Sequence, residues 1–176
     1  MSLHEIVLGD TKPYPEWVRG RVVFKYGGTY AHAAAQAQFG RSLREWARRE
    51  HRGRAAIEWR FRVAPPGEIV RPLIPDVAYL SYAQMPADAP SDRFQTPLGA
   101  PTVAVEILDE DDDPADVEHK ISVYRAAGAA AVIVVDPKAE IVTVHDDRIR
   151  VYRRGDVMTH EALPGFELAV DELFEG

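Results

Sequence analysis

Residues 102–136 read TVAVEILDEDDDPADVEHKISVYRAAGAAAVIVVD, and this stretch decides the fold. Two apolar runs, 102–108 and 131–135, flank a segment in which Asp113 is typical of a helix start and Gly128 of a helix end. A strand, a helix and a strand at this spacing predict a right-handed crossover that makes the two strands parallel. We therefore expect an α/β protein with a mixed central β-sheet.

The remaining elements are expected around this unit. Residues 30–50 carry apolar side chains at helical spacing, which predicts a long helix on one face of the sheet, opposite the helix at 114–127. Residues 81–100 hold three prolines and predict a loop. The tail after 152 is expected to cover the core. Further strands are predicted at 22–24, 55–63, 74–80, 141–145 and 148–152. The strands at 141–145 and 148–152 are expected to form a C-terminal hairpin, and the strand at 22–24 belongs to an N-terminal hairpin region.

Length and composition set the class of protein. A chain of 176 residues with 46% apolar side chains predicts one domain over residues 1–176. The absence of cysteine excludes disulfides and cysteine-based zinc sites. The sequence has no apolar run of membrane-spanning length and no signal-peptide pattern, so no membrane association and a cytoplasmic location are expected.

The net charge of −7 comes from one segment. Asp109 to Glu118 contains seven acidic residues and no Lys or Arg, whereas the other 166 residues hold 21 acidic and 21 basic residues. This run has two interpretations, a cation site and a solvated loop. We favour a helix cap and a solvated rim for Asp109 to Asp113.

Asp76 and Glu106 each lie in an otherwise apolar strand. Burying a carboxylate costs several kcal/mol unless a cation or hydrogen bonds compensate it. If the two strands are antiparallel neighbours, the start of one meets the end of the other, and the two carboxylates lie close together. Such a pair is a typical site for Mg²⁺ or Mn²⁺, which can activate a water molecule and bind a phosphate.

Val117, Ile121 and Tyr124 predict the buried stripe of the helix that leaves the Glu106 strand, and Lys120 lies at the edge of this stripe. A lysine there can orient the attacking water or stabilise the negative charge that develops on phosphorus. The alternative is an ordinary (i, i+4) helix pair with Asp116, one turn earlier.

Two features of the 30–50 helix also have two interpretations. His32 points to the apolar side, as a core or capping histidine does, but a role in the active site is the alternative. Arg41, Arg44, Arg48 and Arg52 recur on the opposite side, which indicates a solvated face or, less specifically, a phosphate-binding stripe.

Taken in order, these residues resemble the Uma-two family of restriction endonuclease-like proteins in the PD-(D/E)XK nuclease superfamily. Glu16 to Gly20 is similar to the family's early Glu-Leu-Ile-Asp-Gly motif, and His32 matches the histidine that opens its first long helix. The other matching motifs are Pro75-Asp76, Glu106-Ile107-Leu108, the spaced trio Asp116, Lys120 and Tyr124, and Asp136-Pro137.

The resemblance implies a restriction endonuclease-like core in which Asp76 and Glu106 are metal ligands. It adds the backbone carbonyl of Ile107 as a further ligand and Glu16 as a further acidic group. The superfamily's lysine lies two residues after the acid, a position that Leu108 occupies here, so the resemblance implies that Lys120 has taken over its role.

Three departures from the family pattern stand out. Asp109 to Asp113 replaces a Ser-Pro-Ser turn, Ala130-Ala131 replaces Tyr-Trp, and Arg19 replaces an acidic residue. The acidic turn would repel DNA phosphates.

The function predicted from the sequence is metal-dependent hydrolysis of DNA by Asp76, Glu106 and Lys120, assisted by Glu16 and His32. Two alternatives remain open, an inactive nuclease-fold binding or regulatory module and a phosphohydrolase acting on a small phosphorylated substrate. A homodimer is compatible with cutting both DNA strands, but no residue indicates one.

Overall fold

The computed structural model describes residues 4–26 and 28–174, and a six-stranded mixed sheet forms its centre. β7 and β8 are the parallel pair, whereas the other neighbours in this sheet run antiparallel. The strands in spatial order are β10 (Ile149–Tyr152), β9 (Ile141–His145), β8 (Ala131–Asp136), β7 (Val103–Ile107), β6 (Val77–Ser81) and β3 (Gly53–Ile57).

The predicted crossover is present as β7, α3 (Pro114–Ala126) and β8. The side chain of Asp113 accepts a hydrogen bond from the Ala115 amide at 2.9 Å and caps α3, while Gly128 takes a φ of 105° just beyond its end. β7 and β8 are parallel, as the sequence predicts, and their register places Val103 beside Ala131.

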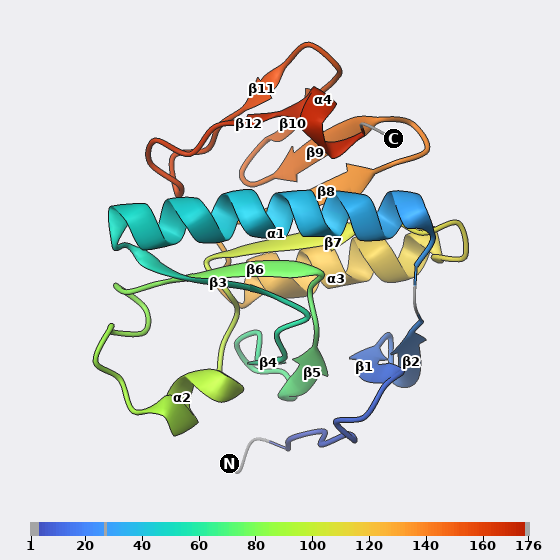
Figure 1. The fold of residues 1–176 in the computed structure, drawn as a ribbon. Helices are drawn as coiled ribbons and strands as arrows, with labels where there is room; N and C mark the ends of the chain where they lie inside the picture. The colour runs from blue at the N-terminus through green and yellow to red at the C-terminus, as the bar shows by residue number, and fades with distance from the viewer. Residues whose placement is uncertain (1–3, 27, 175–176) are drawn as a thin grey trace.

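Two helices cover opposite faces of this sheet (Figure 1). α1 (Tyr30–Glu50) buries Phe39, Leu43 and Trp46 against one face, and α3 buries Val123 and Tyr124 in the cluster on the other. The predicted placement of the two helices is therefore confirmed. The arginines of α1 at 41, 44 and 48 are exposed, which agrees with a solvated face.

The strand predicted over 55–63 is wrong as a single element. It divides into β3 and β4 (Phe61–Val63), because Glu58 has a φ of 49° and its amide donates to the Asp76 carbonyl. β4 then pairs with β5 (Arg71–Leu73) outside the main sheet. The strand predicted from Ile74 begins only at Val77, after Pro75, which has no amide hydrogen to donate.

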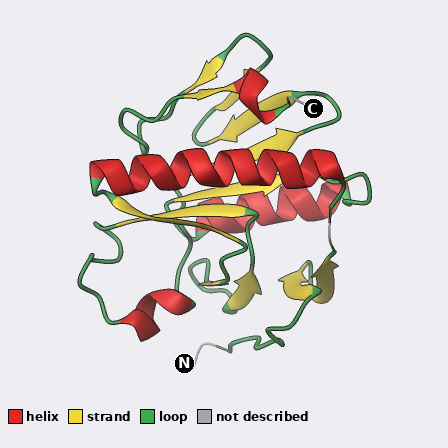
Figure 2. Ribbon diagram, in the orientation of Figure 1, coloured by secondary structure: helices red, strands yellow, loops and turns green. Residues whose placement is uncertain are grey.

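Short elements complete the chain, as the yellow strands and red helices of Figure 2 show. β1 (Tyr14–Val18) and β2 (Arg21–Lys25) form the N-terminal hairpin, and β1 contacts β5 and α3. None of the helices within residues 4–26 and 28–174 is long and apolar enough to cross a membrane. The remaining elements are α2 (Ser91–Gln95), β11 (Val157–Met158), β12 (Leu168–Ala169) and α4 (Val170–Leu173).

Candidate active site

The two carboxylates predicted to meet do so. β6 and β7 are antiparallel with Val77 opposite Val105, so the next pair outward brings Asp76 opposite Glu106. Asp76 is 3% and Glu106 4% exposed, which makes both side chains buried acids. They require compensation by hydrogen bonds or opposite charge.

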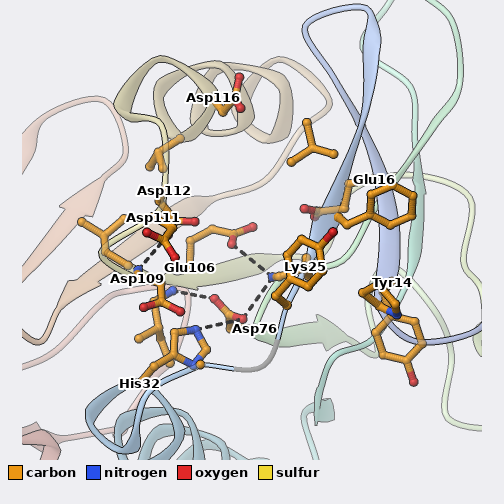
Figure 3. Close-up of a pocket in the computed structure, with 18 of the residues that line it drawn as sticks. Tyr14, Glu16, Lys25, His32, Asp76, Glu106, Asp109, Asp111, Asp112 and Asp116 are labelled. Atoms are coloured by element: carbon orange, nitrogen blue, oxygen red, sulfur yellow. Dashed lines mark hydrogen bonds and ion pairs between the residues drawn. The ribbon is translucent and has the colours of Figure 1, made fainter.

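Asp76 receives that compensation from three elements (Figure 3). Its Oδ2 accepts from the Ile107 amide at 2.7 Å, and its Oδ1 lies 3.0 Å from Lys25 Nζ and 3.5 Å from His32 Nε2. Burial alone would raise the pKa of Asp76, but Lys25, His32 and the Ile107 amide outweigh burial and lower this pKa. Asp76 is therefore ionised at neutral pH. The same contact raises the pKa of His32.

Glu106 lies between two lysines. Its Oε2 is 3.1 Å from Lys120 Nζ and 3.5 Å from Lys25 Nζ, and its Oε1 accepts from the Tyr124 hydroxyl at 3.2 Å. Burial raises the pKa of Glu106, and the two ammonium groups oppose this effect. Tyr124, which the sequence placed in the buried stripe of its helix, therefore also belongs to the polar site.

Glu16 comes from β1 and joins the same cluster. It is 2% exposed, its Oε1 accepts from the Ile74 amide at 2.8 Å, and its Oε2 lies 3.3 Å from Lys120 Nζ. Burial alone would lower the pKa of Lys120, but Glu106 and Glu16 outweigh it and raise this pKa. Lys120 is thus held as an ammonium group.

Lys25 is the member of this cluster that the sequence analysis missed. It ends β2 and contacts both Asp76 and Glu106, as the dashed lines in Figure 3 show. Burial alone would lower its pKa, but the surrounding carboxylates raise it. The available signal was a lysine at the end of the apolar run Val22-Val23-Phe24, the same anomaly that marked the two acids.

The predicted apolar stripe of α3 is partly wrong. Val117 and Ile121 are only half-buried, whereas the buried face carries the charged pair Asp116 and Lys120 together with Val123 and Tyr124. The reason is that this face lies against the N-terminal hairpin, which supplies opposite charges.

Asp116 and Lys120 have different partners. Asp116 accepts from Arg21 at 2.7 and 3.0 Å and from Arg19 at 3.4 Å, whereas Lys120 contacts Glu16 and Glu106. The alternative of an ordinary (i, i+4) pair between these two residues is therefore wrong. Instead, the ion pair of Asp116 with Arg21 holds the N-terminal hairpin against α3.

The acidic turn lies on the rim of the site. Asp113 caps α3, Asp112 accepts from the Asp109 amide at 2.8 Å, and the side chains from Glu110 to Asp113 are exposed. These contacts agree with the predicted helix cap and solvated rim. The turn and the buried cluster line one cleft of 1120 Å³.

The residues present fit a divalent cation through two carboxylates. Among residues 4–26 and 28–174, no group of three or more His, Asp or Glu side chains is arranged to hold a metal ion. Mg²⁺ nevertheless commonly binds through one or two carboxylates and keeps several water molecules. Asp76 and Glu106 supply that donor set, and the Lys25 ammonium group lies against both.

A mixed sheet between two helices, with buried acids and a lysine in a cleft, is the arrangement that the resemblance to restriction endonuclease-like proteins predicted. The sequence profile of the Uma2 family, described as "Putative restriction endonuclease", matches residues 5–171. The chain belongs to this family, as its motifs indicate.

A solved structure supports the fold. A protein from Anabaena variabilis ATCC 29413, described as "a putative nuclease belonging to DUF820", superposes with a TM-score of 0.81 at 20% sequence identity. The match covers 95% of this chain and 93% of that chain, which confirms the expected α/β architecture. No curated protein matches the sequence.

Proposed function

We propose that this chain is a metal-dependent endonuclease that hydrolyses phosphodiester bonds of DNA. Membership of the Uma2 family supports a nuclease in general. The observation that carries the finer proposal is the buried carboxylate pair of Asp76 and Glu106, with Lys120 Nζ 3.1 Å from Glu106, in a cleft of 1120 Å³. Buried charges of this kind cost stability, and their position in a cleft favours a catalytic role.

Asp76 and Glu106 would hold Mg²⁺ or Mn²⁺, together with the Ile107 carbonyl. Such an ion supplies a water molecule of lowered pKa and charge stabilisation at the phosphate. The Ile107 amide fixes Asp76 through its 2.7 Å hydrogen bond, and His32 holds the other oxygen of the same carboxylate. The Tyr124 hydroxyl orients Glu106 in the same way.

Lys120 would position the attacking water or stabilise charge on the phosphate. Its raised pKa keeps a proton on Nζ, so Lys120 acts as a hydrogen-bond donor and not as the base. Glu16 fixes the ammonium group from the opposite side, at 3.3 Å. Glu16 is therefore a positioning residue in this proposal.

One observation favours a second candidate, a phosphohydrolase for a small substrate. Asp109, Asp111, Asp112 and Asp113 line the cleft and would repel the phosphates that flank a scissile bond in DNA. A small phosphorylated molecule would meet less of this rim.

Cleavage assays separate these candidates. Wild-type protein is incubated with supercoiled, linear and single-stranded DNA and with a small phosphodiester, each with Mg²⁺, with Mn²⁺ and with EDTA. We expect metal-dependent nicking of DNA, lost in Glu106→Gln. Cleavage that persists in Glu106→Gln, or in EDTA, would contradict the proposal, and turnover of the small substrate alone would favour the second candidate.

A further inference from the structure

The Lys25 ammonium group is coordinated much as a bound cation would be. Three oxygen atoms surround Nζ, the Ile74 carbonyl at 2.6 Å, Asp76 Oδ1 at 3.0 Å and Glu106 Oε2 at 3.5 Å. These are the two carboxylates expected to bind a divalent metal ion. Lys25 and that ion therefore compete for the same oxygen atoms.

The balance of charge points the same way. Three buried carboxylates, Asp76, Glu106 and Glu16, face the two ammonium groups of Lys25 and Lys120. One further unit of negative charge remains, and His32 Nε2 lies 3.5 Å from Asp76 Oδ1. A divalent cation added to this arrangement would leave excess positive charge in a buried site, which is unfavourable unless one cation withdraws.

Lys25 is the cation that is able to withdraw. Its side chain is 19% exposed, compared with 10% for Lys120, which two glutamates hold on a long helix. Lys25 ends a strand that pairs with β1 in a two-stranded sheet, and its neighbours Phe24 and Tyr26 are 46% and 74% exposed. A long, flexible side chain at such a place can move its charge into solvent.

The cleft offers a destination for the withdrawn group. Lys25 lines it together with Asp109, Asp111 and Asp112, which come from the acidic turn. An ammonium group that leaves the buried carboxylates would therefore still meet negative charge on the rim.

We propose that Lys25 is an internal counterion of the carboxylate pair and that a divalent metal ion binds by displacing it. The inference rests on the metal dependence of the proposed function. Lys25 keeps the metal-free protein stable and weakens its affinity for the ion, and metal binding transfers the ammonium group to the cleft.

Calorimetric titration with Mn²⁺ tests the competition. Because Lys25→Met keeps the apolar stem and removes the charge, we expect Mn²⁺ to bind about tenfold tighter or more than to wild type. Lys25→Arg should bind no tighter than wild type. Lys138→Met, which removes a charge at an exposed position outside the cleft, should bind as wild type does.

Equal or weaker Mn²⁺ binding by folded Lys25→Met would overturn the inference, as would the absence of Mn²⁺ binding in every variant. Circular dichroism establishes that each variant is folded, and Lys25→Gln replaces Lys25→Met if the latter is not.

Amine labelling of the wild-type protein tests the displacement without any substitution. The chain contains Lys12, Lys25, Lys120 and Lys138, which peptide mass spectrometry distinguishes. At saturating Mg²⁺, as determined by calorimetry, labelling of Lys25 should rise several-fold, while buried Lys120 stays protected. Unchanged labelling of Lys25 would exclude its withdrawal.

The two proposals fail in different ways. If Lys25→Met binds Mn²⁺ more tightly but wild type does not cleave DNA, the counterion role of Lys25 is supported and the nuclease function is refuted. If wild type cleaves DNA in a metal-dependent way, but Lys25→Met has an unchanged affinity for Mn²⁺ and the labelling of Lys25 does not change, the nuclease function is supported and the counterion role is refuted.

Discussion

Asp76 and Glu106 are 3% and 4% exposed, and each lies within 3.5 Å of a lysine, whereas Asp111 and Asp112 are exposed on the rim of the same cleft. The acidic run is more conspicuous in the sequence, but the buried pair carries the larger energetic cost. Exposed charges are solvated and screened, while buried charges persist only with partners. The comparison teaches that burial and countercharge identify a site better than the density of acidic residues.

The largest effect is expected at Asp76. Asp76→Ala leaves the buried Ile107 amide without its acceptor and removes the nearest carboxylate of Lys25, so we expect a loss of about 2 to 3 kcal/mol of unfolding free energy and no detectable DNA cleavage. Asp111→Ala on the rim should leave the unfolding free energy close to that of wild type and should not abolish cleavage. Urea denaturation and a plasmid nicking assay measure the two quantities. If Asp76→Ala and Asp111→Ala had equal effects on stability and cleavage, the buried cluster would be no more important than the exposed rim.

Lys120 should matter more to the reaction than any exposed lysine. Lys120→Met removes the ammonium group 3.1 Å from Glu106, and we expect cleavage to slow about a hundredfold or more. Lys138→Met, at an exposed position, is the matched control and should cleave DNA at the wild-type rate. If folded Lys120→Met cleaves DNA at the wild-type rate, Lys120 contributes to stability and not to the reaction.

Acid should weaken the buried region selectively. Since the pKa of folded Asp76 is lowered relative to the unfolded chain, its contribution to stability is present above the unfolded pKa of about 3.9 and is lost as the pH falls. The difference in unfolding free energy between wild type and Asp76→Asn should therefore shrink from about pH 6 to about pH 3. The corresponding difference for Asp111→Asn should stay near zero. A constant difference for Asp76→Asn would show that its charge is not stabilised by folding.

The smallest effect is expected at Asp113, the residue of the acidic turn that caps α3. Asp113 accepts the Ala115 amide at the start of α3, so Asp113→Ala should cost about 1 kcal/mol of unfolding free energy. Asp113→Asn, which retains a capping oxygen, should restore most of it. Thermal or urea unfolding measures both variants, and identical losses would mean that the charge, and not the cap, matters at this position.

Local patterns made much of the fold predictable. The apolar runs on both sides of the 114–127 helix determined the parallel strands, and the stripe of Phe39, Leu43 and Trp46 determined the face of α1 that is buried. Asp76 and Glu106 were recognisable because an acid in an apolar strand has few physical explanations. The extent of the domain over residues 1–176 stays a prediction.

Other features depended on contacts between distant segments. The break at Glu58 arises where its amide reaches the Asp76 carbonyl, and no local signal announces that contact. The charged face of α3 looked unsuitable for burial because its partners, Arg21 and Glu16, lie about a hundred residues earlier in the chain. Periodicity describes one element at a time, so it cannot identify the partners of a charge.

The sequence by itself determined the α/β class, the family motifs and the identity of the two buried acids, because these follow from short-range periodicity and from the cost of burying charge. Only the tertiary structure decided which cations compensate those acids. It folds the N-terminal hairpin against β5 and α3 and so brings Lys25 to Asp76, a contact across 51 positions of the chain. Electrostatic partnership depends on distance in space, and folding alone determines that distance.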